Sequence, residues 1–315
     1  MLNIIKNLDG TTGVQVEADI FNMTDRELEQ FVRQIPNHHF LLLKNVPHDK
    51  QKLVEFADRI GDSMVPDEGY FFSDDDHVQI TRVTNKRDDD GNKIGLFADL
   101  ELCWHCNGGL REDVKQITLM LYCDKPGDQD YGITGFCNTR AAYEDLPNDI
   151  KQLVDRIVVR HSTKAFTSET QTIGRNDGGY ALTPEDPEYP IFNGIQLTEE
   201  GNTTYTAETK GLWKPLVATH LWNKTKSLYF TPSFICEWEH LDGVDFDQQW
   251  LWEYLYNHTY QDKYIYKHRW ESGDFIINDQ WHGMHNRTEV KGDRNMYRFC
   301  VDNCNIIAEN SYENK

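Results

Sequence analysis

The sequence lacks any apolar run long enough to cross a membrane, and it lacks an excess of basic residues. No segment approaches the roughly 20 apolar residues of a membrane-spanning helix, and the first ten residues show no basic-then-apolar secretion signal. Lys and Arg number 32 against 52 Asp and Glu, a net charge of −20. Such a chain repels nucleic-acid phosphates and anionic membranes. We therefore expect neither nucleic acid nor membrane as a partner.

Two further absences narrow the chemistry. There is no Gly-X-Ser-X-Gly elbow, which argues against a serine hydrolase. The seven cysteines are an odd number and no signal precedes them, so we expect reduced thiols in a cytoplasmic compartment. Cys103 and Cys106 could form half of a zinc site with Cys300 and Cys304, but side chains three apart on a strand face opposite sides.

What the chain does have is enough apolar material for a packed core. Its 315 residues are 38% hydrophobic and 12% aromatic, with no repeat and no low-complexity linker, so we expect a single domain over residues 1–315. Residues 166–214 are rich in Thr, Gly, Glu, Asp and Pro and show little apolar periodicity. A stretch of this kind inside a compact chain predicts a lid or insertion at about 163–214.

Hydrophobic periodicity and capping residues locate the expected elements. Helices are predicted from the capping box at Thr24 to Gln34, over 50–60, over 139–157 with a break at Pro147, and over 247–256. Strands are predicted over 40–43, 78–83, 117–123, 227–230, 264–270, 274–278 and 295–301. Early helices followed by many short strands and long loops favour an α+β fold with a β-sandwich or jelly-roll core.

Three separated stretches carry residues that suit a non-haem iron site. In an extended segment His105 and Asn107 point to one face. A distal histidine, His285, lies in the stretch 273–287, and Arg294 and Arg298 follow it. Fe(II) oxygenases hold iron with protein ligands on one face and leave positions open for a bidentate co-substrate and O2. Arginine suits the far carboxylate of a dicarboxylate co-substrate better than lysine does.

The ordered set of these stretches resembles the Fe(II)/2-oxoglutarate-dependent dioxygenases of the taurine dioxygenase and clavaminate synthase type. The resemblance covers most of the chain and lies in residues 41–43, 56–61, 104–105, 141–146, 273–274, 279–285 and 294–298. It implies a double-stranded β-helix (jelly-roll) core with flanking helices. It also implies Fe(II), 2-oxoglutarate as co-substrate, O2, and hydroxylation of an unactivated C–H bond in a small polar metabolite that bears a carboxylate or sulfonate.

The resemblance assigns roles to individual residues. His105 and His285 look like the iron histidines, because His285 follows Asp279 by six residues as in the family, whereas His282 lacks that spacing. Arg294 resembles the arginine that grips the C5 carboxylate of 2-oxoglutarate. Arg298 resembles the position that meets an anionic substrate in some members. The connection before them is about two residues shorter than in taurine dioxygenase, so the two arginines could exchange roles.

Four further positions are weaker candidates. Thr134 matches a threonine that assists 2-oxoglutarate binding, although an ordinary strand-edge threonine would look the same. Phe166 and Phe234 fall where relatives place aromatic residues that face the substrate, and core packing is the alternative for both. Glu101 shares strand parity with His105 and could line the substrate site, or it could be a solvent-facing charge.

Asn107 departs from the family pattern, which has Asp or Glu at this position. An amide oxygen can ligate a metal but brings no charge, so metal affinity should fall. Three interpretations stay open. In the first, Asn107 is a weak ligand or lies just outside direct coordination, and the enzyme still hydroxylates or desaturates with help from the substrate or another group. In the second, the position receives a halide, as in related halogenases. In the third, the protein is a non-catalytic jelly-roll binding protein. The sequence also leaves open whether the chain forms a homo-oligomer.

Overall fold

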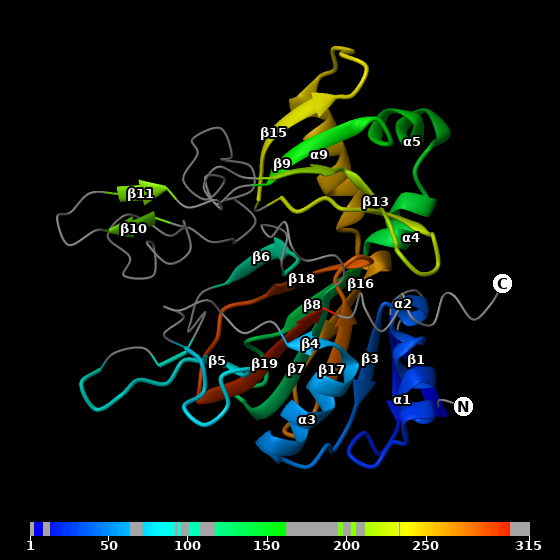
Figure 1. Ribbon diagram of the computed structural model, residues 1–315. Helices are drawn as coiled ribbons and strands as arrows, with labels where there is room; N and C mark the ends of the chain where they lie inside the picture. The colour runs from blue at the N-terminus through cyan, green and yellow to red at the C-terminus, as the bar shows by residue number, and fades with distance from the viewer. Residues whose placement is uncertain are drawn as a thin grey trace.

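The computed structural model describes residues 3–8, 13–63, 72–91, 94–95, 101–107, 117–161, 195–197, 203–205, 212–232 and 234–302, and the statements below concern these residues. Two β-sheets form the lower part of the molecule in Figure 1. The functional candidates lie on strands of both sheets, so the arrangement of the sheets decides which of them meet.

The larger sheet has eight strands and collects segments from the whole chain. Its order is β1-β2-β3-β17-β7-β19-β4, and β5 pairs with β19 as a side branch. All its pairings are antiparallel except the parallel pair β2–β3. The strands are β1 (Asn3–Leu8), β2 (Gly13–Glu17), β3 (Phe40–Leu43), β4 (Asp62–Ser63), β5 (Thr81–Thr84), β7 (Ile117–Pro126), β17 (Phe275–Asp279) and β19 (Arg294–Asp302).

The smaller sheet has four antiparallel strands in the order β16-β8-β18-β6. They are β16 (Ile265–His268), β8 (Thr134–Asn138), β18 (Gly283–Arg287) and β6 (Leu102–His105). Chain neighbours β17 and β18 belong to different sheets, so the short segment between them crosses from one layer to the other.

The alternation of side chains along β3 between the two faces of the large sheet shows how the layers pack. Phe40 and Leu42 belong to the apolar cluster between the two sheets, which also holds Phe136 of β8 and Met296 of β19. Leu41, like Leu43, faces the other side of the large sheet. Because side chains alternate along a strand, one fully buried strand can serve two cores.

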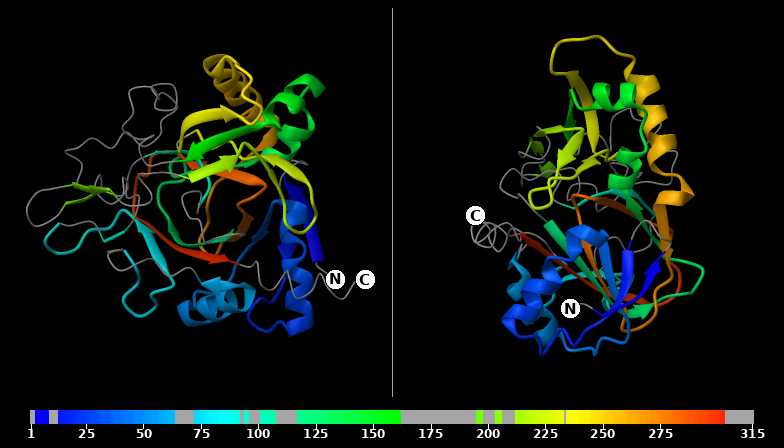
Figure 2. Two further views of the ribbon diagram at one scale, coloured as in Figure 1. Left: turned by 45° about the horizontal axis from the view of Figure 1, so that its top comes forward. Right: turned by 90° about the vertical axis from the view of Figure 1, so that its right-hand side faces the viewer.

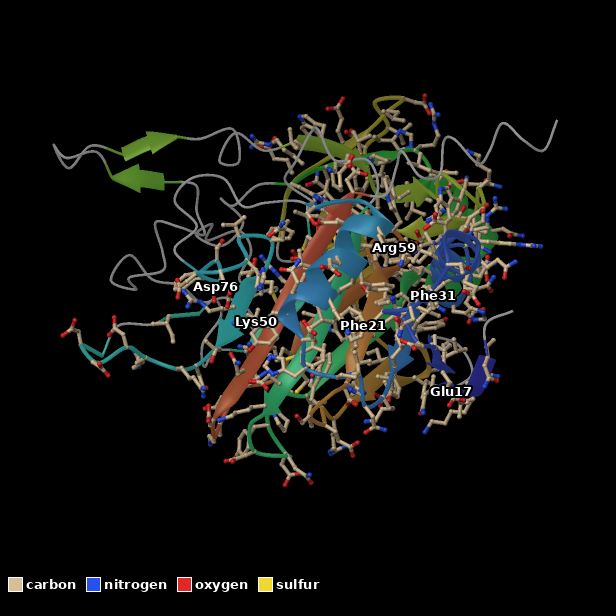
Figure 3. The ribbon with its side chains drawn as sticks, turned by 60° about the horizontal axis from the view of Figure 1, so that its bottom comes forward. Glu17, Phe21, Phe31, Lys50, Arg59 and Asp76 are labelled. Carbon is tan, nitrogen blue, oxygen red and sulfur yellow. The ribbon has the colours of Figure 1, made fainter. Side chains whose placement is uncertain are left out.

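Helices α1 (Asp25–Val32) and α3 (Lys50–Ile60) cover the outer face of the large sheet. Figure 3 looks onto this face, with Lys50 and Arg59 labelled near the two ends of α3. Lys50 pairs with Asp74 at 2.6 Å and Arg59 with Asp25 at 3.1 Å. These ion pairs tie α3 to neighbouring segments, while its apolar side supplies most of the packing.

A second body of helices and short strands packs above the small sheet, and Figures 1 and 2 show it at the opposite end from α1 and α3. Its core is a separate apolar cluster that includes residues of β6 and β18, so it supports the small sheet from outside. Its elements are α4 (Thr139–Glu144), α5 (Asn148–Val154), β9 (Ile157–His161), β12 (Leu212–Pro215), β13 (Val217–Thr219), β14 (Lys226–Leu228), β15 (Ile235–His240), α9 (Gln248–Thr259) and the 3-10 turn η3 (Asp262–Tyr264).

Most predicted elements are confirmed, with shifts at their ends. The capping box of Thr24 is present, and α3 begins after Asp49, whose side chain accepts from the Lys52 backbone N–H. The strand predicted at 78–83 was misplaced: β5 begins at Thr81, because residues before it form a turn closed by the Ile80 N–H to the His77 carbonyl. The helix predicted over 139–157 is two helices, since Pro147 caps α5 and β9 begins at residue 157.

The predicted lid at about 163–214 lies largely outside the described residues. Within it, β10 (Ile195–Leu197) pairs with β11 (Thr203–Tyr205), and β12 pairs with β9. The lid stays a prediction. Among the described residues, no helix is both long and apolar enough to cross a membrane.

The packing of α3 leads to a stability prediction. Leu53 is fully buried against the large sheet, so Leu53→Ala should lower the free energy of unfolding by about 3 kcal/mol. Gln51→Ala, on the exposed side of the same helix, should change it by less than about 0.5 kcal/mol. Urea denaturation measures both, and equal losses would contradict this account of the core.

Candidate functional site

Strands β6 and β18 place two histidines directly opposite each other. His285 is the cross-strand partner of His105, and their ring centroids lie 4.2 Å apart. Both side chains are buried. Because these strands come from distant parts of the chain, only the pairing register creates this pair.

The two imidazoles are in the protonation state that binds metals. The His105 Nδ1 lies 2.7 Å from the Cys103 carbonyl oxygen, which can only accept, so Nδ1 carries the proton and Nε2 presents a lone pair. Burial, together with the charges of Arg298 and Arg287, lowers the pKa of His105 to about 4. Burial and the neighbouring His105 hold the pKa of His285 well below its ordinary value. Both rings are therefore neutral at pH 7, as ligation requires.

Asn107 lies at the corner between His285 and Arg298. Its Nδ2 is 3.5 Å from His285 Nε2, and its Oδ1 is 3.4 Å from Arg298 Nη1. Gln280 accepts from the Asn107 backbone N–H at 2.8 Å and from its Nδ2 at 3.3 Å. The two histidines thus fit an iron site. The position where the family has a third, acidic ligand, called the third corner below, presents an amide nitrogen instead of a carboxylate.

Arg294, at the start of β19, is a buried cation without a carboxylate partner in the described part of the chain. Its side chain is among the largest fully buried ones, with Nη1 donating to the Gly132 carbonyl and Nη2 lying 2.7 Å from Met296 Sδ. Burial lowers the pKa of Arg294 to about 10, so the group remains charged at neutral pH. A buried charge that lacks a counter-ion is unfavourable. The site therefore suits an anionic ligand.

Glycine at position 132 makes room for this guanidinium. A Cβ there would lie 1.9 Å from Arg294 Nη1, and the φ of Gly132 is +62°. Both features exclude a larger side chain.

Arg294 and Arg298 project from β19 of the large sheet, while the histidines belong to the small sheet. Arg294 contacts Met296, which belongs to the apolar cluster between the sheets. Arg298 reaches across to Asn107 and also lies 3.4 Å from Thr81 Oγ1. Arg298 and the two candidate metal-ligating histidines therefore meet between the two layers.

The structure describes three of the four weaker sequence candidates, and they differ in how close they lie to the histidine pair. Thr134 on β8 is buried and accepts a hydrogen bond from Trp270 Nε1 at 2.8 Å. The Phe234 ring meets His105 edge to face, with centroids 6.5 Å apart. Glu101 is exposed just before β6, as expected of a solvent-facing charge, and its role in substrate binding stays a prediction. Phe166 lies outside the described residues.

Sequence reasoning missed Gln280 and Thr81, which contact Asn107 and Arg298. Gln280 directly follows Asp279 in a stretch that the sequence had already singled out, but its chemical type gave no signal. Only the crossing from β17 to β18 brings it to the site.

His282, the rival of His285, belongs to a different cluster. Ligand atoms of His220, Asp279 and His282 lie within 4.8 Å of one another, all buried. However, His220 Nδ1 accepts from the Trp222 backbone N–H, so its Nε2 carries the proton and donates to Asp279 at 2.9 Å. This Nε2 has no lone pair for a metal in that state. The cluster is a hydrogen-bonded support of the crossing segment.

Comparisons with known proteins identify the family of this chain. Residues 5–300 match the model of the taurine catabolism dioxygenase TauD, TfdA family. The chain is 24% identical over 270 residues to pentalenolactone F synthase of Streptomyces avermitilis, covering 83% of this chain and 80% of the relative. It is 22% identical over 271 residues to the alpha-ketoglutarate-dependent 2,4-dichlorophenoxyacetate dioxygenase of Cupriavidus pinatubonensis, with 80% of each chain covered.

Solved structures show the same fold. AAD-2, crystallised with Mn(II) and N-oxalylglycine, aligns with a TM-score of 0.66 at 19% identity over 96% of this chain and 97% of its own. A taurine dioxygenase from Burkholderia xenovorans aligns with a TM-score of 0.67 at 17% identity over 95% of this chain and 89% of its own.

The chain belongs to the taurine catabolism dioxygenase TauD, TfdA family. It is accordingly an oxidoreductase that depends on Fe(II) and 2-oxoglutarate and acts on C–H bonds. The resemblance inferred from the sequence, its co-substrate and its reaction class are thereby confirmed.

A buried histidine near the site predicts a pH dependence of stability. His39 is buried, and neither ring nitrogen has a partner among the described residues. Burial, with a smaller effect of His282, lowers the pKa of His39 to about 3. Its unfolded pKa is about 6.5, so between these values the unfolded chain binds the extra proton. Stability is therefore lost as the pH falls below about 6.5.

Replacing this group should flatten the dependence. The wild type should lose more unfolding free energy than His39→Asn between pH 6.5 and pH 4, by about 3 kcal/mol. This difference arises because each pH unit between the folded and unfolded pKa values of His39 contributes up to about 1.4 kcal/mol. Asn tolerates the positive φ of 64° found at this position. Urea denaturation across that range measures the slope, with His77→Asn near the surface as the control. An unchanged slope in His39→Asn would refute the assignment.

Proposed function

We propose that this oxygenase hydroxylates an unactivated C–H bond of a small polar metabolite that carries a carboxylate or sulfonate. The observation that carries the proposal is the position of Arg298, a half-buried cation that contacts Asn107 beside the histidine pair. The buried guanidinium of Arg294, which lacks a counter-ion in the described chain, supports binding of the anionic co-substrate. We also infer that the two facing sheets form a double-stranded β-helix (jelly roll), which the strand orders support.

In this proposal His105 and His285 would hold Fe(II). Bound iron, with 2-oxoglutarate and O2, supplies the oxidising chemistry. The protein contributes preorganisation: the Cys103 carbonyl fixes the tautomer of His105, and burial keeps both rings neutral. Neutral ligands need not lose a proton when metal binds, so iron affinity should change little above pH 6.

Arg294 would bind the C5 carboxylate of 2-oxoglutarate. Its guanidinium is fixed by the Gly132 carbonyl and by Met296, so little side-chain freedom remains to be lost on binding. Between the sheets the charge is poorly screened, which strengthens its attraction to a carboxylate. Thr134, on the same β8 segment that follows Gly132, would assist from the small sheet.

Arg298 would meet the anionic group of the substrate. It is half-buried, lies beside the histidine pair and contacts Asn107 and Thr81. The names of two similar proteins contain small anions, a carboxylate in 2,4-dichlorophenoxyacetate and a sulfonate in taurine. Phe234, edge-on to His105, would contact the apolar part of the substrate.

Halogenation is a second candidate because one observation favours it. The Asn107 oxygen faces Arg298, so the corner that holds an acidic ligand in the family is left without one. Product analysis with chloride present distinguishes the two reactions, since only a halogenase forms a carbon–chlorine bond.

Iron binding provides the first test. Anaerobic addition of Fe(II) and 2-oxoglutarate should give the weak visible charge-transfer band of this enzyme class, and His105→Ala and His285→Ala should each abolish it because each removes a ligand. His258→Ala, on α9 of the second body, should leave the band unchanged. If the wild type binds no iron and, after O2 is admitted, releases no succinate from 2-oxoglutarate, the protein is a non-catalytic binding protein.

The role of Arg294 provides the second test. Arg294→Met should raise the Kd of 2-oxoglutarate by about 100-fold, which is about 2.7 kcal/mol, because a buried charge-assisted contact is lost. Arg298→Met should instead raise the KM of the anionic substrate. The same anaerobic titration measures the co-substrate, and the reverse pattern would show that the two arginines exchange roles.

A further inference from the structure

The orientation of the Asn107 side chain is fixed by neighbours whose hydrogen-bonding character is unambiguous. A guanidinium can only donate, so the atom of Asn107 that lies 3.4 Å from Arg298 Nη1 must be its oxygen. The nitrogen therefore points the other way, toward His285 Nε2 at 3.5 Å. An amide orientation argued from such partners does not depend on distinguishing oxygen from nitrogen directly.

Gln280 imposes the same orientation independently. The backbone N–H of Asn107 can only donate, so the Gln280 atom 2.8 Å away is Oε1. That oxygen also lies 3.3 Å from the Asn107 side-chain amide, which must offer N–H to it. Gln280 Nε2 in turn donates to Asn278 Oδ1, and the Gln280 side chain is buried. Gln280 is thus held at both ends of its amide.

A flipped Asn107 would lose both contacts. Its nitrogen would face the donor Arg298, and its oxygen would face the acceptor Gln280 Oε1. Ligation by the Asn107 oxygen requires this flip, because the oxygen now points at Arg298 and the N–H group at His285. The surrounding side chains therefore oppose coordination by Asn107.

The charges at the site point to what fills this corner. In the family an acidic residue supplies one negative charge here, and this chain has a neutral one. Before the substrate binds, a divalent metal, Arg294 and Arg298 would face only the dianion 2-oxoglutarate. The net charge of the site is then more positive by one unit than that of a site with a carboxylate at this position. An N–H group and a guanidinium beside such a corner are donors suited to an anion.

We propose that Gln280 and Arg298 are positioning residues that keep Asn107 out of metal coordination, so that its N–H group helps to bind a small anion from outside at the third corner. The anion is either chloride from solution or the carboxylate of the substrate. This inference rests on the proposed function, because it requires a metal on His105 and His285.

Cobalt(II) is a suitable probe, because its visible absorption reports the ligand set directly. The protein is loaded with Co(II) and saturated with 2-oxoglutarate in a buffer otherwise free of halide and carboxylate, and it is titrated with chloride and, separately, with acetate. Wild-type protein should show a saturable spectral change with at least one of them. A spectral response to chloride but not to acetate would identify a halide site, and a response to acetate would identify a carboxylate site. In Asn107→Asp the Co(II) affinity should rise by about 10-fold and the anion response should disappear, because the new carboxylate takes the corner.

Variants at position 280 test the positioning role. Gln280→Met removes the acceptor and frees the Asn107 amide, so the anion affinity should fall by about 10-fold while Co(II) binding persists. Gln280→Glu keeps an acceptor oxygen for both Asn107 donors but loses the donor to Asn278 and adds a negative charge near the corner, so its anion affinity should also fall. Gln249→Met, the same change on the exposed face of α9, is the control and should match wild type. Wild-type anion affinity in Gln280→Met would overturn the role of Gln280.

The outcomes separate the two proposals. If Co(II) and 2-oxoglutarate bind but neither anion changes the spectrum, the third corner is not an anion site and this inference fails while the proposed function stands. If Co(II) fails to bind, or binds equally to His105→Ala and His285→Ala, the proposed function fails and this inference fails with it.

Discussion

The pairing of β6 with β18 is the constraint on which the site depends. It sets His285 opposite His105, and a slip of one residue would turn one of the rings to the other face of the sheet. An irregularity follows immediately, because Arg287 pairs with Leu102. The apolar cluster outside the small sheet, which includes Trp104 and Met284, holds this register by burying the opposite faces of the same strands.

The site also depends on positive charge that is concentrated between the sheets of an acidic protein. The chain carries a net charge of −20, yet Arg294 and Arg298 face inward from β19. A buried guanidinium is unfavourable unless an anion accompanies it, so the buried Arg294 suits the proposed binding of the anionic co-substrate. The histidines remain neutral in the same environment because burial and the arginines disfavour their charged forms.

Much of the architecture follows from local sequence signals. The limits of α3 match the prediction because Asp49 caps it and its apolar residues recur at helical spacing. β3 and β7 were found because buried strands are continuous apolar runs. The prediction at 78–83 was wrong because Val78 and Ile80 alternate like a strand, although the backbone there turns before β5 begins. Alternation alone does not distinguish a strand from a turn that leads into one.

The sequence by itself determined the chemical types at the site: histidines at 105 and 285, arginines at 294 and 298, and a neutral amide where the family has an acid. The spacing of His285 after Asp279 separated it from His282, and the structure places His282 beside His220 instead. Only the tertiary structure decided which atom of Asn107 faces the histidines, because that choice depends on Gln280 and Arg298, which lie far along the chain. Spacing along one chain cannot encode it, since the orientation of an amide depends on which donors and acceptors other strands bring to it.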